Sequence, residues 1–322
     1  MNFLTAVKAG RLVDSKSLKY SLMGKYKNGI TAISDSGQVI FLTGNRVRGP
    51  FTVFVPGIEN FLGVFQQGQI VITDQISIRI PEADLFISSD SMDIWPPYEN
   101  ENPQVCDVSR IRISSLNVLS DCCQAGIREM DSVCALKAYL DHYQCNEVLG
   151  GTQKAFISNF AAIHQAFSED NYYGIIEAAT GLIGLGGGIT PAGDDFLAGF
   201  LIALSYVGDQ LGISKKIYLH IAEEIILRSK KKTNPISAAL LGAALQKEMN
   251  EPLFSVIQSL VRGTRVSFEA IHNLSSVGHT SGFDGLTGCL FVFCVLLGEF
   301  EHLKSKPIEV ELDVYTKKEI FQ

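Results

Sequence analysis

Two segments of this sequence repeat one pattern whose residues suit ligand binding or acid–base chemistry. Residues 193–201 and 282–290 both fit G-x-D-x-L-x-G-x-L, with Asp195 and Asp284 at the shared acidic position. Each segment continues into a long apolar run, so the pattern predicts a buried helix with a carboxylate in its first turn. A helix start offers unpaired backbone N–H groups and a partial positive charge. Two such starts that face one another would form a polar pocket inside an apolar body.

The segment before the first aspartate is rich in glycine. Residues 184–193 read GLGGGITPAG, and five of these residues are glycine. Glycine at this density costs backbone entropy, so a positive φ angle or a close approach to a ligand is expected. The N–H groups of Gly186–Gly188 are candidate oxyanion donors, and Thr190 with Pro191 fits the start of the next helix. The alternative is a tight loop between helices, whose acids only complement the helix dipole.

The acidic residues restrict which ligand fits this loop. Backbone N–H groups attract anionic oxygens, whereas Asp194 and Asp195 would repel a bare phosphate. Either a divalent cation such as Mg²⁺ lies between the phosphate and Asp194, Asp195 and Asp284, or the ligand carries N–H donors as well as anionic oxygens. A small carbamoyl or amide anion has this second combination, which we favour. The lysine of a Walker loop is missing, which argues against a nucleotide site.

The second copy of the pattern adds an imidazole beside its helix start. His279 precedes Thr280 and Ser281, and its reference pKa suits a general acid or base near neutral pH. On this hypothesis Asp195 and Asp284 anchor NH₂ groups or a metal ion, and His279 moves protons. The alternatives are a surface histidine and a helix cap in which Asp284 pairs with Ser281.

Two more segments are candidates for the same site. Asn234-Pro235 predicts a third helix start, with Asn234 as the N-cap, and Arg46 and Arg48 lie in a predicted turn. Arginine suits carboxylate or phosphate, although a solvated hairpin tip is the alternative. The remaining predicted ligand-binding residues lie in or beside the three helix starts: Gly186, Gly187, Gly188, Thr190, Gly193, Asp194, Thr280, Ser281, Gly282, Thr233, Asn234 and Ser237.

The candidate residues must be positioned by helices and strands, and the sequence pattern predicts an α+β protein. The first third contains short β-favouring runs broken by turn residues such as Asp35-Ser36-Gly37, which predicts a hairpin. From about residue 116 the apolar spacing becomes helical. We expect a β-rich domain over 1–115, with a Pro-rich loop near 95–103, and a mainly α-helical domain over 116–322 with the glycine-rich loop. The predicted strands are 17–23, 29–34, 38–43, 51–55, 68–73, 75–80 and 308–314; the predicted helices are 152–168, 171–183, 214–230 and 286–300, with further starts at Asn234 and Asn250.

The composition limits the function classes. The net charge of −7 argues against a nucleic-acid partner. Only 19% of residues are charged, so we expect partner-covered surface and an oligomer. The apolar runs are too short to span a membrane, and the first residues lack a signal-peptide pattern, so a cytoplasmic location is expected. The seven cysteines form no C-x-x-C pair, and reduced thiols are predicted; Cys122 and Cys123 receive no role.

The stretch 184–199 resembles the signature of a bacterial family that was long a domain of unknown function and includes the AllH-type subunit of oxamate carbamoyltransferase. The usual form is G-L-G-x-G-L-T-P-S-G-D-D. Further matches are Gly49-Pro50-Phe51 after the paired arginines, 233–240 and 278–284. Two departures are Gly187 and Ala192, which stand where Pro and Ser are common.

The resemblance implies a role in purine and allantoin nitrogen breakdown. It implies a reaction that interconverts carbamoyl phosphate plus oxamate with oxalurate plus phosphate, together with FdrA-type partner subunits. Both substrates carry NH₂ groups and anionic oxygens, which agrees with the ligand type favoured from the residues. Two other functions stay open: a non-catalytic scaffold or regulatory subunit, whose glycines only allow tight helix packing, and a Mg²⁺-dependent phosphotransferase.

Overall fold

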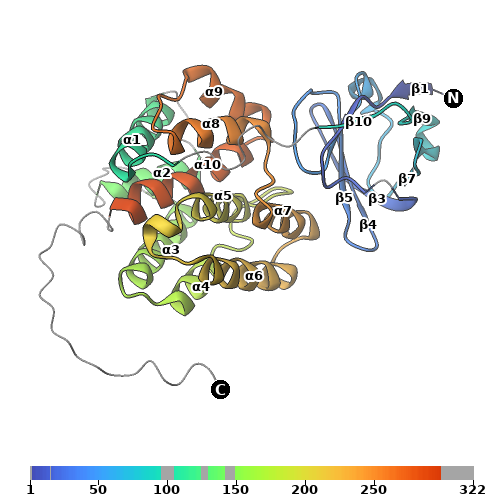
Figure 1. Cartoon of the computed structure of the whole chain (residues 1–322). Helices are drawn as coiled ribbons and strands as arrows, with labels where there is room; N and C mark the ends of the chain where they lie inside the picture. Colours follow the sequence, from blue (N-terminus) through green and yellow to red (C-terminus); the bar gives the residue numbers. More distant parts are fainter. Residues whose placement is uncertain (1, 15, 96–104, 125–129, 142–148, 299–322) are drawn as a thin grey trace, which may run out of the picture.

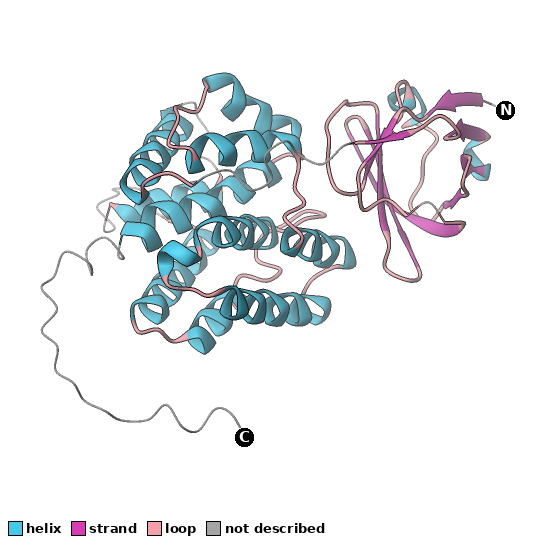
Figure 2. Ribbon diagram, viewed as in Figure 1, coloured by secondary structure: helices cyan, strands magenta, loops and turns pink. Residues whose placement is uncertain are grey.

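The computed structural model describes residues 2–14, 16–95, 105–124, 130–141 and 149–298. An N-terminal mixed β-sheet is followed by a helical region, which confirms the predicted α+β class (Figures 1 and 2). The predicted strand at 308–314 and most of the predicted loop at 95–103 lie outside the described residues. The division into two domains stays a prediction. The first described α-helix begins at Val108.

The sheet contains strands that the sequence predicted and others that it did not. Its order is β1-β9-β8-β7-β3-β4-β5-β6-β2-β10. The predicted hairpin at 35–37 joins the antiparallel strands β4 and β5, and Gly37 there has a φ of 82°. Four strands were missed, β1, β2, β9 and β10, because they are short and irregular in pattern. The bounds are β1 Asn2–Thr5, β2 Lys8–Ala9, β3 Leu18–Tyr26, β4 Gly29–Ser34, β5 Val39–Thr43, β6 Thr52–Phe54, β7 Ile70–Thr73, β8 Ser77–Ile80, β9 Leu85–Ser88 and β10 Asp93–Ile94.

The helical region follows some of the predicted helix starts, whereas α1, α2 and α9 were not predicted individually. Helix α5 begins at Ala192 with Pro191 at the N-cap position, so Thr190 is not the predicted cap; its hydroxyl bonds to Ser281 instead. Side chains cap the starts as expected: Ser214 accepts from the N–H of Ile217, and Asn250 accepts from that of Leu253. The last predicted helix begins earlier than expected, at Ser281, and continues as a π-helical turn over Val292–Leu296. The bounds are α1 Val108–Gln124, α2 Asp131–Leu140, α3 Gly151–Ser168, α4 Tyr172–Thr180, α5 Ala192–Val207, α6 Lys215–Lys232, α7 Pro235–Leu245, α8 Glu251–Val261, α9 Phe268–Asn273 and α10 Ser281–Phe291.

The two copies of the repeated pattern form α5 and α10, which pack against each other at the centre of the helical region. A Cβ atom on Gly199 of α5 would lie 1.8 Å from the carbonyl oxygen of Gly285, and one on Gly288 of α10 would lie 1.9 Å from that of Phe196. Because Gly199 and Gly288 occupy the same position of the pattern, each copy supplies a glycine that admits the other copy's backbone. The glycine that the two copies share at this position is therefore explained by the helix contact.

Aromatic rings surround the α5–α10 pair and complete the core. Phe196 of α5 and Phe291 of α10 have ring centroids 5.8 Å apart, and Phe160 of α3 stacks on Phe291 at 4.9 Å. All three side chains are fully buried. Large buried rings contribute strongly to packing energy, so the two acidic helix starts are carried by helices that pack in the aromatic core.

Helix α7 joins the helical region to the sheet, beside β5 in Figure 1. Ile236 and Ala243 of α7 share a buried apolar cluster with Val39 and Phe51 of the sheet region. The first residues of α7 also contact the glycine-rich loop, as described below. Helix α7 thus contacts both the sheet region and that loop, and Ile189 of the loop also lies close to Gly24 of β3.

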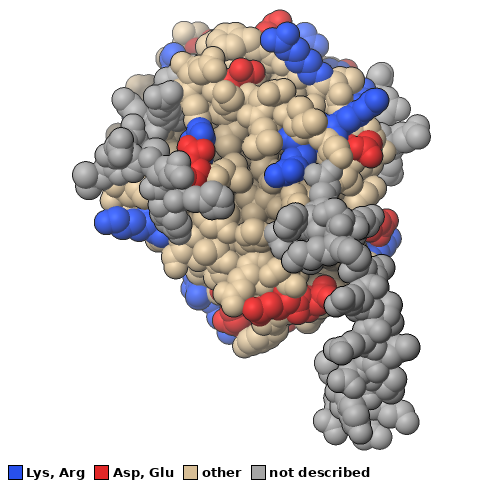
Figure 3. Space-filling model, turned by 90° about the vertical axis from the view of Figure 1, so that its left-hand side faces the viewer, with Lys and Arg blue, Asp and Glu red and all other residues tan. Residues whose placement is uncertain are grey.

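One face of the molecule carries few charged side chains over large areas (Figure 3). In the face drawn in Figure 3, lysine, arginine and acidic side chains lie in separate small groups with uncharged surface between them. Among the described helices, none has the length and apolar character needed to cross a membrane. The predicted oligomer stays a prediction.

Candidate functional site

Three helix starts, those of α5, α7 and α10, meet at one place, which we call the helix-start junction. The hydroxyls of Thr190 and Ser281 lie 2.8 Å apart and join the starts of α5 and α10. The Thr233 hydroxyl donates to Asp194, and the Asn234 amide donates to the carbonyl of Ile189 at 2.8 Å, which joins α7 to the same loop. The structure thus brings together the three segments that the sequence had marked separately.

Asp195 lies at this junction with one oxygen unsatisfied. Its side chain is 91% buried, and its Oδ2 has no hydrogen-bond partner among the described residues. Burial raises the pKa of Asp195 well above its ordinary value, and the charges of Asp284 and Asp194 raise it further, while the Ser281 and Thr190 hydroxyls lower it. A buried acceptor without a donor is costly, so Asp195 is the strongest candidate to receive a ligand N–H.

Asp284 is the counterpart of Asp195 on α10. It is 1% exposed; its Oδ1 accepts from the Ser132 hydroxyl at 2.5 Å, and its Oδ2 has no partner in the described part of the chain. Burial raises the pKa of Asp284 to about 6, the Ser132 and Thr280 hydroxyls lower it, and the charge of Asp131 raises it. The two copies of the pattern therefore each hold a buried carboxylate with one free oxygen.

Asp194 differs from its neighbour because both of its oxygens have partners. The N–H of Gly184 donates to Oδ1 at 2.9 Å, and the Thr233 hydroxyl donates to Oδ2. These bonds fix the glycine-rich loop to the starts of α5 and α7. Asp194 thus shapes the loop, and the predicted ligand role has less support for it than for Asp195.

The glycines of the loop have the conformations that their density suggested. Gly184, Gly186 and Gly188 have φ angles of 78°, 102° and 94°, which other residues rarely adopt. Gly186, Gly187 and Gly188 are exposed, and within the described chain their N–H groups donate no backbone hydrogen bond. These N–H groups are available to an anionic oxygen.

Gly193 and Gly282 have a packing role instead. A Cβ atom would lie 2.0 Å from the carbonyl oxygen of Leu182 at Gly193, and 2.3 Å from that of Leu274 at Gly282. Both glycines therefore admit a neighbouring backbone carbonyl at the start of their helix. Their predicted contact with a ligand stays a prediction.

Three further predicted residues, His279, Asn234 and Ser237, differ in their exposure and in what they contact. His279 is exposed on the loop before α10, where a proton could be exchanged with solvent or ligand. Asn234 caps α7 by accepting from the N–H groups of Ile236 and Ser237. Ser237 is buried with its hydroxyl 3.4 Å from the Asn234 amide. Asn234 and Ser237 thus stabilise the start of α7 within the junction.

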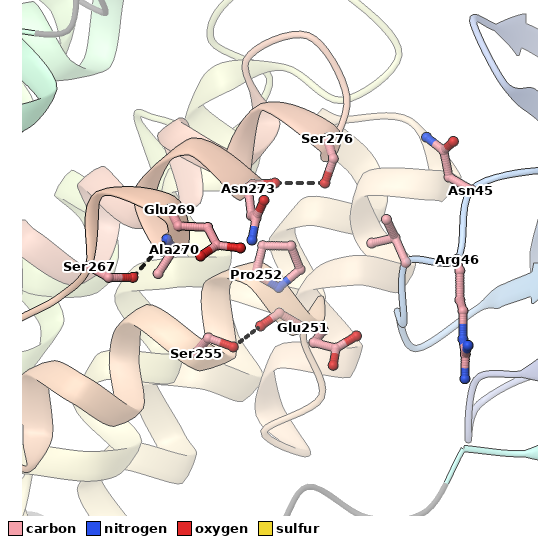
Figure 4. A pocket seen from close by; sticks show the side chains of 11 residues that line it. Asn45, Arg46, Glu251, Pro252, Ser255, Ser267, Glu269, Ala270, Asn273 and Ser276 are labelled. Atoms are coloured by element: carbon pink, nitrogen blue, oxygen red, sulfur yellow. Dashed lines mark hydrogen bonds between the residues drawn. The ribbon is translucent and has the colours of Figure 1, made fainter.

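Arg46 and Arg48 lie in a segment of the sheet region that contacts α8 and α9. Arg46 lines a hollow of about 590 Å³ between its own turn and these helices, together with Asn45, Glu251 and Ser276 (Figure 4). The carbonyl of Arg48, a largely buried residue, accepts from the N–H of Glu251 at 2.9 Å. The binding of the proposed ligand by the two arginines stays a prediction.

Ser132 of α2 is a member of the site that sequence reasoning missed. It is fully buried and contacts both Asp284 and Thr287. A lone serine near the start of an amphipathic helix gives no signal of its own, and only the tertiary contact between α2 and α10 reveals it. Among the described residues, no group of three or more His, Cys, Asp or Glu side chains is arranged to hold a metal ion.

The raised pKa of Asp284 predicts how stability depends on pH. Since the folded state binds this proton more tightly than the unfolded state, the group favours folding below pH 4. This contribution is lost as the pH rises through about 6. The loss is on the order of 2 kcal/mol. Urea unfolding of wild type and Asp284→Asn at pH 4.5 and 7.5 measures it: the variant should gain relative to wild type at the higher pH. An equal difference at both pH values would contradict the prediction.

Comparison with protein families agrees with the resemblance seen in the sequence. Residues 182–293 match the family model described as oxamate carbamoyltransferase subunit AllH. The matched range begins at the glycine-rich loop and ends within the π-helical turn after α10, so it contains α5, α7 and α10 and hence the whole helix-start junction. No solved structure matches the chain.

Proposed function

We propose that this chain is a subunit of an oxamate carbamoyltransferase or a related enzyme, and that it binds a small carbamoyl or amide anion at the helix-start junction. One observation carries the proposal: two buried carboxylates, Asp195 and Asp284, each have an oxygen with no partner among the described residues. The family match over residues 182–293 supports the same class of function.

The chemistry of the junction suits a ligand with two kinds of polar group. The free oxygens of Asp195 and Asp284 accept hydrogen bonds, so they suit the NH₂ groups of a carbamoyl or amide compound. The exposed N–H groups of Gly186–Gly188 donate, so they suit its anionic oxygens. Oxamate and carbamoyl phosphate each combine both kinds of group. A bare anion would meet the two carboxylates without compensation.

The reaction needs a group that accepts a proton. The nitrogen of oxamate forms a bond to the carbamoyl carbon, the bond from that carbon to the phosphate oxygen breaks, and phosphate leaves with the electron pair. One proton must leave the attacking nitrogen. We assign the acceptance of this proton to a carboxylate of the junction and its later release to exposed His279, since a carboxylate with a raised pKa is a stronger base than an ordinary one.

A non-catalytic scaffold subunit is the second candidate, and one observation favours it. Glycines of the repeated pattern serve the close packing of α5 on α10, as the contacts of Gly199 and Gly288 demonstrate. A scaffold needs this packing but has no use for two buried carboxylates with free oxygens. We therefore rank ligand binding first, with partner subunits completing the enzyme.

Calorimetric titration of the purified chain tests the proposal. Carbamoyl phosphate and oxamate are added separately and together, with and without Mg²⁺. Saturable binding of at least one of them is expected, with about 10-fold or more weaker binding in Asp195→Asn. Binding that requires Mg²⁺ would assign the carboxylates to a metal ion instead. Absence of binding under every condition, also after mixing with the partner subunit, would favour the scaffold.

A further inference from the structure

Two fully buried hydroxyls lie beside Asp284, those of Ser132 and Thr287, and only that of Ser132 can donate to it at close range; the half-buried Thr280 hydroxyl also interacts with this carboxyl group. The Ser132 hydroxyl lies 2.5 Å from Asp284 Oδ1 and 3.3 Å from the Thr287 hydroxyl. The Thr287 hydroxyl in turn donates to the carbonyl of Phe283 at 2.8 Å. Since a hydroxyl carries a single hydrogen, Thr287 has none left to donate. The hydrogen of Ser132 therefore goes to Asp284 Oδ1, the nearer of its two acceptors.

This arrangement makes the two oxygens of Asp284 unequal. Oδ1 is occupied by Ser132, whereas Oδ2 is buried without a partner among the described residues. A carboxylate oxygen that already accepts a strong hydrogen bond is the less basic of the two. A proton or a ligand N–H thus meets Asp284 at Oδ2.

We propose that Ser132 is a positioning residue for Asp284: by occupying Oδ1, it directs Oδ2 to receive the proton from the ligand nitrogen. The inference rests on the proposed function and adds to it the oxygen that takes the proton and the residue that selects it. It places the proton-accepting role on Asp284 and leaves Asp195 to anchor an NH₂ group. The charges that face Asp284 come from Asp131 of α2 and from Asp195 of α5.

Replacing Ser132 with alanine tests the inference. Because the Ser132 hydroxyl lowers the pKa of Asp284, its loss should raise that pKa by about one unit or more from about 6. The measurement is a ¹³C NMR titration of the side-chain carboxyl groups in the full chain, with the Asp284 signal assigned from its absence in Asp284→Asn. The pH at which carbamoyl phosphate binding is half-maximal should move by the same amount.

Ser115→Ala is the matched control. Ser115 of α1 is also fully buried, and its hydroxyl has no partner in the described part of the chain. The control should leave the titration of Asp284 unchanged. If it moves the pKa of Asp284 as far as Ser132→Ala does, the effect is general loss of packing and the inference is wrong. Ser132→Thr keeps the hydroxyl and should restore the wild-type midpoint.

The outcomes separate this inference from the proposed function. An unchanged pKa in Ser132→Ala, or a changed pKa with an unchanged pH profile of binding, overturns the positioning role. Failure of the wild type to bind either substrate overturns the proposed function, whatever the titration gives. Should Ser132→Ala not fold, Ser132→Cys replaces it, because the thiol is a much weaker donor of similar size and should shift the pKa in the same direction.

Discussion

Replacing Asp195 with asparagine is expected to weaken ligand binding, and any activity of the assembled enzyme, about 100-fold. The substitution keeps the size of the side chain, replaces one carboxylate oxygen with an NH₂ group and removes the negative charge. An NH₂ group of the ligand would then meet a donor or a neutral acceptor where it had met a carboxylate. A hydrogen bond to a charged group contributes about 1.5–3 kcal/mol, and each 1.4 kcal/mol is a factor of ten in affinity.

The same substitution should leave the fold intact, which separates a ligand role from a capping role. Because burial raises the pKa of Asp195 strongly, its ionised form costs stability at neutral pH, and a neutral amide removes that cost. Thermal unfolding at pH 7.5 should therefore show no loss for Asp195→Asn. The exposed Asp209, just beyond the other end of α5, provides the control: Asp209→Asn should change neither stability nor binding. A loss of folding shared by Asp195→Asn and Asp284→Asn would show that both aspartates are helix caps.

Adding one methyl group at Gly199 or Gly288 is expected to destabilise the protein by at least about 3 kcal/mol. In both cases the new Cβ atom would meet a backbone carbonyl oxygen at less than 2 Å. A backbone cannot swing aside as a flexible side chain does, so α5 and α10 must separate. Their separation would open the aromatic core around Phe196 and Phe291. Urea unfolding of Gly199→Ala and Gly288→Ala measures the loss.

Gly242 offers a matched control within the same region. It also lies inside a helix, α7, but apart from its chain neighbours and the backbone of its own helix no atom lies within 4 Å of the position that its Cβ would occupy. Gly242→Ala should stabilise the protein by about 0.5–1 kcal/mol, as expected from helix propensity alone. Equal effects at Gly199 and Gly242 would contradict the close contact between α5 and α10.

The sequence by itself determined the order of a β-rich part followed by a helical part, and the starts of several helices. Local chemistry decides helix starts, so the caps at Ser214, Asn234 and Asn250 are where the sequence predicts them. The density of glycine in 184–193 similarly predicts positive φ angles, because glycine has no Cβ atom to hinder that conformation. Short strands such as β1 and β10 were missed, since their pairing depends on distant partners rather than on their own residues.

Only the tertiary structure decided the roles within the site. Asp194 and Asp195 are adjacent and chemically identical, yet one has both oxygens satisfied by Gly184 and Thr233, and the other has one oxygen free. Ser132 reaches Asp284 from a helix that is far away in the chain. Two of the repeated glycines, Gly199 and Gly288, also proved to serve packing between the two copies. Burial and hydrogen-bond partners are properties of the assembled core, and they set both the basicity of a carboxylate and its availability to a ligand. A pattern in the chain can therefore locate the acids, whereas the packing of α2, α5, α7 and α10 determines what each acid is able to do.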